Sequence, residues 1–329
     1  MEVFDKNTVK ERAAGLLEGS RPDLKRTAAL HTAVSVGAVV AVNLIIMLLP
    51  GLFGDTGGLA SLGVQSMLDT AQSALSLACQ IALIFWDVGL LYSAMLTARS
   101  QPAEFSSLNR GFHRFGPVLR LNLLKLCVYM LAGMLCMNVV MIAAAFMPVS
   151  QTLNAELEAM TQTLQAGGEL TEEMLFSKNM LLGMAPILIL FMVAYGVMLL
   201  HLNYRFRLAD FLVLDDPRRG ALAALVLSNA LIKGSKTALF KLDLSMWWYF
   251  ALQLVLLAVA NLGDILALAG VELPLSSDGR FFLFYILYGI GAVAAAYFTG
   301  ARYQTVYATV YDHYRGQLED LMQRRPVQY

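Results

Sequence analysis

Long apolar stretches alternate with short polar segments along the whole chain. Each stretch is at least as long as the about 20 residues that an α-helix needs to cross a bilayer core of about 30 Å. Runs of this length and continuity are not typical of strands or amphipathic helices in a soluble core. The pattern predicts six transmembrane helices, near residues 28–50, 74–97, 118–148, 179–203, 239–266 and 281–301.

Composition agrees with this pattern. Hydrophobic residues make up 58% of the chain and charged residues 15%, and the mean hydropathy is +0.61. This balance departs from that of soluble domains toward that of membrane proteins. The formal net charge is zero, so we expect no nucleic-acid partner. The sequence therefore predicts an all-α, polytopic protein that forms a single integral membrane domain over residues 1–329.

Basic residues gather on one side of the predicted topology. Of the 24 Lys and Arg residues, all but Lys178 and Arg280 fall in the N-terminal segment, the second and fourth loops, and the C-terminal segment. The positive-inside rule places these segments in the cytoplasm. Five acidic residues crowd the third loop on the opposite side, namely Glu156, Glu158, Glu169, Glu172 and Glu173. Both termini are therefore expected in the cytoplasm. The first apolar run has no small-residue cleavage site before the second span, so we interpret it as a retained anchor.

The segments that precede the first, third and fifth spans share a plan, in which a short amphipathic helix comes before a basic residue and a span. The clearest copy has Asp216 as predicted N-cap, Pro217 as the first helical residue and Gly234 after the last turn. The other two copies are expected to end near Gly19 and about Gly111. We therefore predict three helical hairpins, each preceded by a cytoplasmic amphipathic helix.

Internal similarity supports these hairpins. A glycine, a serine, a base and a leucine recur in step around Gly19 and Gly234, and Ser107 and Asn122 match Ser228 and Asp243 at a constant offset. The predicted repeats cover about residues 8–100, 101–210 and 211–315. Chance similarity among apolar segments is the alternative interpretation.

One stretch resembles a known bacterial family. Its matching residues are Tyr204-Arg205-Phe206-Arg207-Leu208-Ala209, Asp215-Asp216-Pro217, Ala224, Ser228, Leu231, Lys233-Gly234, Leu239-Phe240-Lys241-Leu242-Asp243-Leu244-Ser245 and Trp248. They resemble the integral membrane family called "domain of unknown function 975". The resemblance implies a six-span protein of the bacterial cytoplasmic membrane, and it carries no known catalytic or binding residue.

Ionisable side chains inside the spans are the candidate functional residues, because a charge at the centre of a membrane helix costs about 2.5 to 3.5 kcal/mol. Asp87 in the second span is the strongest candidate, and Lys125 lies in the third. We expect Asp87 to point into the bundle. The alternatives for it are a structural pair with Lys125, a proton or ion relay, and a water-exposed carboxylate.

Two further polar residues complete the candidate set. Asp243 lies where the fifth span begins and is expected to cap or hydrogen-bond the break before it. His201 ends the fourth span, where a lone histidine is more typical of the membrane interface than of a metal site. We therefore expect no bound metal. The three cysteines, Cys79, Cys127 and Cys136, are expected to be free thiols inside spans.

The last span combines small and aromatic residues. Its small residues, Gly289, Gly291, Ala292, Ala296 and Gly300, predict a seam of close helix packing. Beyond them, a row of tyrosines on one side of the continuing helix is interpreted as an interfacial aromatic belt. These tyrosines are Tyr303, Tyr307, Tyr311 and Tyr314.

No motif in the chain supports an enzyme. It contains no His-Glu-x-x-His, Gly-rich phosphate loop or Cys-x-x-Cys, and no Ser/His/Asp set. We expect neither catalytic residues nor a cofactor. The sequence favours a non-enzymatic module that faces membrane lipids or binds another membrane protein. The alternative is a transporter of a small solute or ion that uses Asp87 and Lys125.

Overall fold

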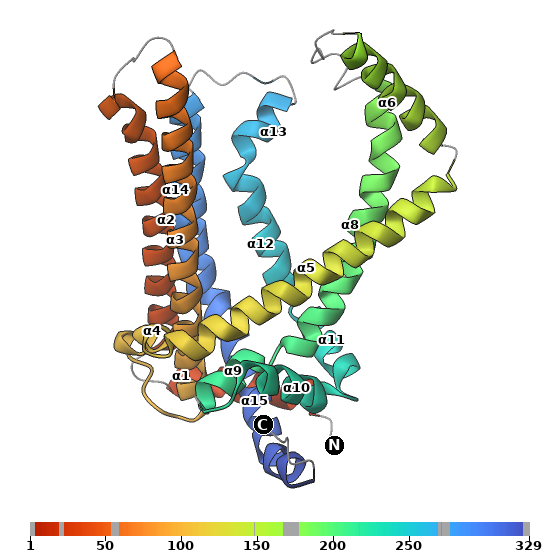
Figure 1. The fold of residues 1–329 in the computed structure, drawn as a ribbon. Coiled ribbons are helices and arrows are strands. Elements are labelled where there is room, and N and C mark those ends of the chain that lie inside the picture. Colours follow the sequence, from red (N-terminus) through yellow and green to blue (C-terminus); the bar gives the residue numbers. More distant parts are fainter. Residues whose placement is uncertain are drawn as a thin grey trace. The chain divides into compact units, whose positions relative to one another are not determined.

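The fold is all-α. A computed structural model describes residues 4–19, 23–53, 59–147, 149–166, 178–216, 218–268, 271 and 277–324 (Figure 1), and all regular secondary structure within these ranges is helical. The chain divides into two compact units. The first unit is Met1–Leu119 with Leu208–Tyr329, and the second unit is Arg120–Arg207.

In the described ranges, five helical segments are long and apolar enough to cross a membrane. Two consecutive helices, α11 (Lys236–Ser245) and α12 (Trp247–Ala260), bring the number to six if they form one bent span. Each predicted apolar stretch therefore corresponds to helical structure, and a polytopic architecture follows. The five segments are Leu24–Ile46, Ser66–Ala98, Phe115–Ala145, Gly183–Asp215 and Leu283–Gly316.

The fifth stretch differs from the single helix predicted over residues 239–266, because α11 and α12 meet at an angle of 60°. At the bend, the Ser245 hydroxyl donates to the carbonyl of Leu242 at 2.7 Å, and the N–H of Met246 donates to the carbonyl of Asp243 at 2.9 Å. These bonds to the third preceding residue replace the regular α-helical pattern. Hydropathy located the apolar stretch but carries no information about this bend.

In the first unit, α2 (Leu24–Phe53), α3 (Leu59–Ala98) and α14 (Ser277–Ala295) lie side by side (Figure 1). The glycines of α14 face two different helices. A Cβ at Gly289 would lie 3.1 Å from Val36 of α2, and one at Gly291 would lie 2.6 Å from Leu256 of α12. The predicted seam of small residues is confirmed at Gly289 and Gly291, where an added Cβ would require the facing side chain to move.

The last span continues beyond α14. A π-helical turn, η2 (Ala296–Gly300), joins α14 to α15 (Ala301–Arg324). The apolar segment Leu283–Gly316 has 34 residues, and at 1.5 Å per residue it is about 51 Å long, well beyond a bilayer core of about 30 Å. Part of α15 must therefore extend past the hydrocarbon region if α14 crosses it.

One segment of α15 is buried all round. Every residue from Thr305 to Tyr311 is buried, and the helix packs against α1 (Lys6–Gly19), α2 and α3. Tyr307, Tyr311 and Tyr314 are at most 2% exposed. Their interpretation as an interfacial belt is wrong, because an amphipathic belt residue keeps its ring at the lipid headgroups, whereas these rings are enclosed by protein.

Helical segments occupy the three positions where short helices were predicted before a span, but the copy near Gly234 begins later than predicted. In the copy predicted to begin at Asp216, the helix α10 runs from Ala221 to Ile232 after Gly220, and Pro217 lies outside the described residues. The Asp216 carboxylate accepts from the N–H of Arg218 at 3.1 Å instead. Such a local Asx turn competes with helix capping, which explains the late start.

The three predicted ends are close to those observed. Helix α1 ends at Gly19, and α10 ends two residues before Gly234, whose φ of +96° is the left-handed conformation expected after a last turn. The middle copy consists of a 3₁₀ helix, η1 (Phe105–Asn109), and one α-helical turn, α4 (Arg110–His113).

This middle segment lies directly against α3. A Cβ built on Gly89 of α3 would overlap the backbone carbonyl of Leu108, and one on Gly111 would overlap the carbonyl of Phe85. The Ser93 and Ser107 hydroxyls also share a hydrogen bond of 2.5 Å across the contact. Two glycines therefore permit a backbone approach that no other residue allows.

The second unit contains most of α5 (Phe115–Ala145), with α6 (Val149–Gln165) and α8 (Lys178–Phe206). Helix α6 occupies a region expected to be a loop, and it packs against α8. Of the acidic residues predicted for that loop, Glu156 and Glu158 lie on α6, and Glu169, Glu172 and Glu173 lie outside the described residues. Helices α5 and α8 meet where Gly133 faces the ring of Tyr195, at 3.3 Å from a built Cβ.

Candidate functional site

The four sequence candidates are divided between the two units. Asp87 lies on α3 and Asp243 on α11, both in the first unit, whereas Lys125 on α5 and His201 on α8 belong to the second. Lys125 is half-buried and His201 is exposed. The proposed pair between Asp87 and Lys125 joins residues of different units and stays a prediction.

Asp87 lies beside a histidine that sequence reasoning did not consider. Its carboxylate is 3.2 Å from Nε2 of His31 on α2, an ion pair when the imidazole is protonated. The Asp87 side chain is 66% exposed and that of His31 only 6%. Because the Asp87 side chain is largely exposed, the expectation that it points into the bundle is wrong within its own unit. The buried member of the pair is His31 on α2.

The Trp86 side chain helps to position His31. Its indole N–H donates to the backbone carbonyl of His31 at 3.3 Å, and the indole stacks on the imidazole with ring centroids 5.9 Å apart. His31 lies in the first predicted span. An ionisable residue at that place was the signal that could have identified it.

Asp243 is held by one of the buried tyrosines. Its carboxylate accepts a hydrogen bond from the hydroxyl of Tyr307 on α15. The expectation that the Asp243 side chain caps or hydrogen-bonds the break before the fifth span stays a prediction, since the bond at the bend from the N–H of Met246 goes to the Asp243 backbone carbonyl. The bond from Tyr307 links α11 to α15.

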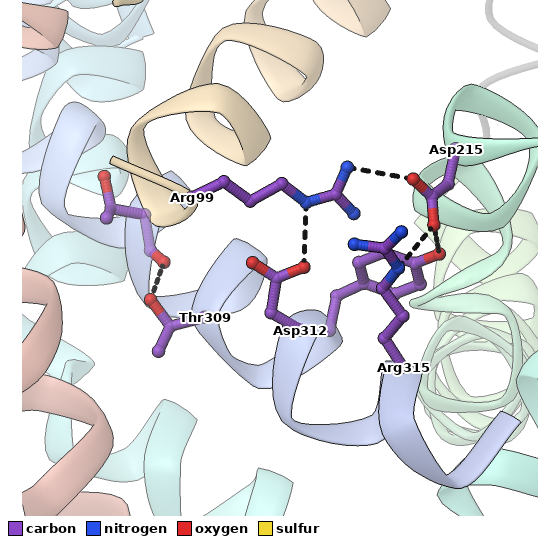
Figure 2. A network of polar contacts seen from close by, with 7 residues as sticks. Arg99, Asp215, Thr309, Asp312 and Arg315 are labelled. Carbon is purple, nitrogen blue, oxygen red and sulfur yellow. Dashed lines mark hydrogen bonds and ion pairs between the residues drawn. The ribbon is translucent and has the colours of Figure 1, made fainter. Parts of the chain in front are cut away.

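A polar cluster in the described part of the first unit centres on Arg99 (Figure 2). Its Nε donates to Asp312 of α15 at 3.1 Å, and its Nη1 donates to Asp215 of α9 (Ala209–Asp215) at 2.9 Å. Asp215 also lies 3.3 Å from Nε of Arg315 and accepts from the Tyr311 hydroxyl at 2.9 Å. We call these five residues the Arg99 cluster.

Local backbone structure aims Arg99 toward its partners. Helix α3 ends at Ala98, and the next residues fold back on its last turn, with the N–H of Gln101 donating to the carbonyl of Leu96 at 2.8 Å. Ser100 adopts a left-handed φ of 57°. This C-terminal cap leaves Arg99 directed across the end of α3 toward α9 and α15.

The cluster is a set of charged groups that neutralise one another. Burial lowers the pKa of Arg99, but its hydrogen bonds with Asp215 and Asp312 and the charge of both carboxylates outweigh this effect and raise the pKa above its ordinary value. The guanidinium therefore stays charged. Such an arrangement ties three helices together, and its carboxylates are committed to arginines rather than to proton transfer.

Sequence reasoning did not single out the Arg99 cluster. Arg99 follows the second span, Asp215 lies in the stretch that resembles a known family, and Asp312 and Arg315 are three residues apart on one helix. Each observation is ordinary taken alone. Only the contact between segments 213 residues apart joins Arg99 to Asp312.

Among the residues that the structure describes, no group of three or more His, Cys, Asp or Glu side chains is placed to hold a metal ion. The cysteines at 79, 127 and 136 are free.

Comparison with protein families found no match, and comparisons with curated proteins and with solved structures found none either. The resemblance to "domain of unknown function 975" stays a prediction.

Proposed function

We propose that the protein is a non-enzymatic, multi-pass module of the bacterial cytoplasmic membrane that acts through lipid-facing helix surfaces, by binding lipids or another membrane protein. Both termini lie in the cytoplasm. The proposal includes no bound cofactor.

The observation that carries this proposal is the distribution of apolar and polar side chains. Large apolar side chains are exposed along α5 and α8, including Leu131 at 61%, Ile142 at 63% and Met192 at 70%. In contrast, the charged groups of the Arg99 cluster pair with one another. Exposed apolar helix surfaces suit lipid tails or apolar partner helices.

The topology rests on the distribution of bases, because all but two of the 24 Lys and Arg residues lie in segments assigned to one side. The packing of Phe4 against His313 and Tyr314 supports termini on a common side, since it holds the N-terminal segment beside α15.

Site-specific labelling tests the topology. In a variant with all three native cysteines replaced, a cysteine at Gln162 on α6 should react with an impermeant reagent added to whole cells, and one at Arg218 should react only after the cells are opened. Equal reaction at both positions in whole cells contradicts the topology.

Photo-crosslinking tests the lipid-facing surface. A photoreactive residue at Leu131, which is 61% exposed, should capture phospholipid or a membrane protein in intact membranes. The same residue at Leu121, which is 1% exposed, should capture neither and serves as the control. Capture of soluble proteins alone at Leu131 contradicts the proposal.

One observation favours the alternative function of a transporter, namely the titratable pair of His31 and Asp87 on two adjacent candidate spans. A transporter that moves protons through this pair should lose pH-dependent flux in liposomes on Asp87→Asn. Asp69→Asn, an exposed carboxylate on the same helix, is the matched control. Flux that is absent in the parent, or unchanged in Asp87→Asn, rejects this alternative.

A further inference from the structure

Helices α10 and α11 carry apolar side chains that their own packing does not use. The inner faces of the two helices bury Leu227, Leu231, Leu239 and Leu242. The outer faces expose Leu222 and Val226 on α10, Phe240 and Leu244 on α11, and Trp247 at the start of α12, each between 50% and 66%. We call these five outer side chains, with Lys233, Lys236 and Lys241, the elbow surface.

The spacing of the outer side chains places them in ordered pairs. Leu222 and Val226 are four residues apart, as are Phe240 and Leu244, so each pair occupies one stripe of its helix. With 12 and 10 residues, α10 and α11 are too short to cross a bilayer by themselves. Short helices with an unburied apolar stripe are typical of segments that lie in the membrane interface.

The connection of α11 to a candidate span indicates that the elbow surface lies next to the membrane. Helix α11 leads directly into α12 through the 60° bend, and the pair passes the length and hydropathy test for a span only when both helices are counted. Trp247, 64% exposed, lies at the bend. Tryptophan prefers the level of the lipid headgroups, so the elbow surface lies where the chain leaves the hydrocarbon core.

Charge identifies the kind of lipid. Lys233 and Lys241 are exposed and Lys236 is half-buried. Lys233 lies between α10 and α11, where Gly234 turns the chain with a φ of +96°. Of the carboxylates in the described residues, none lies within ion-pair distance of these three lysines. The lysines therefore have their charge available for an external anion.

We propose that the elbow surface binds anionic phospholipid, with Leu222, Val226, Phe240 and Leu244 among the upper acyl chains and Lys233, Lys236 and Lys241 on the headgroup phosphate. This inference rests on the proposed lipid-facing function and adds a headgroup class to it. Each lysine near an anionic surface strengthens lipid binding by about fivefold.

Lipid-selective quenching tests the proposal. The full-length protein, free of native cysteines and carrying a fluorophore on a cysteine at the exposed Thr237 of α11, is reconstituted in phosphatidylcholine with small fractions of quencher-labelled lipid. At equal fraction, labelled phosphatidylglycerol should quench the fluorophore more strongly than labelled phosphatidylcholine, by about tenfold or more. A fluorophore at Leu131 on α5 should show no such preference.

Charge variants identify the residues. In the triple variant Lys233→Gln, Lys236→Gln, Lys241→Gln, the ratio of quenching by phosphatidylglycerol to quenching by phosphatidylcholine at position 237 should fall to about one. The matched control, Lys6→Gln, Arg12→Gln, Arg26→Gln, removes three exposed bases elsewhere and should keep it. Equal quenching by both lipids in the parent overturns the proposal, and so does an equal loss in both triple variants.

Two arms separate the possible causes. Soluble glycerol phosphate at millimolar concentration should not reduce the preference for phosphatidylglycerol, because it lacks the acyl chains that the outer leucines and Phe240 contact. If glycerol phosphate abolishes the preference, the site binds the free anion and the lipid assignment is overturned. Quenching at Leu131 by both lipids with no preference at Thr237 rejects this inference alone. Absence of quenching at Leu131 rejects the lipid-facing function itself.

Discussion

The two units of the chain use similar residues in different ways. In the first unit, the segment 305–311 of α15 is buried all round, and its Tyr307 and Tyr311 hydroxyls donate to the carboxylates of Asp243 and Asp215. In the second unit, α5 and α8 expose side chains such as Leu131 and Met192. Both units therefore expose apolar side chains, as Leu254 at 67% shows for the first unit, but the first unit also contains buried and polar contacts that fix its helices, whereas α5 and α8 bury few of their side chains.

This difference has a physical reason. Lipid tails are as apolar as leucine, so burial of an apolar side chain between membrane helices gains little over its exposure to lipid. Close packing and polar contacts must hold the helices together instead. The first unit has both, in the glycine contacts of α3 and in the Arg99 cluster. Four substitutions test whether stability is divided between the units in this way.

The largest effect is expected from Gly89→Ala. The new Cβ would overlap the backbone carbonyl of Leu108, which cannot rotate away, and we expect a loss of about 3 kcal/mol or more in the free energy of unfolding. Reversible unfolding in mixed detergent micelles measures it. Gly196→Ala in α8, where nothing lies within 4 Å, is the control and should change stability by about 1 kcal/mol at most. Equal effects contradict the comparison.

A leucine pair gives the next effect. Leu212→Ala removes a side chain that is 0% exposed in the first unit and should cost about 2 to 5 kcal/mol through the cavity it leaves. Leu131→Ala, at 61% exposure in the second unit, should cost about 0.5 kcal/mol or less. The same unfolding assay compares them. A large loss for Leu131→Ala would mean that a protein surface, not lipid, covers α5.

Arg99→Met should destabilise the first unit by about 2 to 3 kcal/mol. It leaves the carboxylates of Asp215 and Asp312 without their shared partner, and the cost stays below that of a fully buried pair because the Arg99 side chain is 22% exposed. Arg218→Met, which removes an exposed guanidinium, is the control and should be near neutral.

The effect of Arg99→Met should not depend on pH in the neutral range. The pKa of Arg99 is raised in the folded protein, so its stabilisation is fully present below the ordinary arginine pKa and is lost only as the pH rises past the folded value. The stability difference between parent and variant should therefore be constant between about pH 6 and 9. A difference that shrinks in this range contradicts the assignment.

The smallest effect is expected from Asp5→Ala at the start of α1. The N–H and hydroxyl of Thr8 donate to the Asp5 carboxylate at 3.1 and 2.8 Å, and these bonds hold its pKa below the usual value. This stabilisation is present above the ordinary pKa of about 3.9 and is lost as the pH falls through the lower folded value. Parent and Asp5→Ala should differ slightly in melting temperature at neutral pH, and they should not differ at a pH below the folded-state pKa of Asp5. The control Glu11→Ala should match the parent at every pH.

The sequence by itself determined the features that depend on neighbouring residues. The six apolar stretches could be recognised because crossing a bilayer requires length and hydropathy, both of which are local. The turn at Gly234 and the small residues facing Val36 and Leu256 followed for similar reasons, since a left-handed φ and a close approach each demand a particular residue type.

The tertiary structure decided which charged groups meet. Asp87 lies beside His31 and not inside its bundle, Asp243 accepts from Tyr307, and Arg99 joins Asp215 and Asp312 from segments 116 and 213 residues away. No periodicity within one helix contains this information, because the partners of a charge are set by how helices pack and end. The bend between α11 and α12 belongs to the same class, since hydropathy is unchanged when a helix turns by 60°.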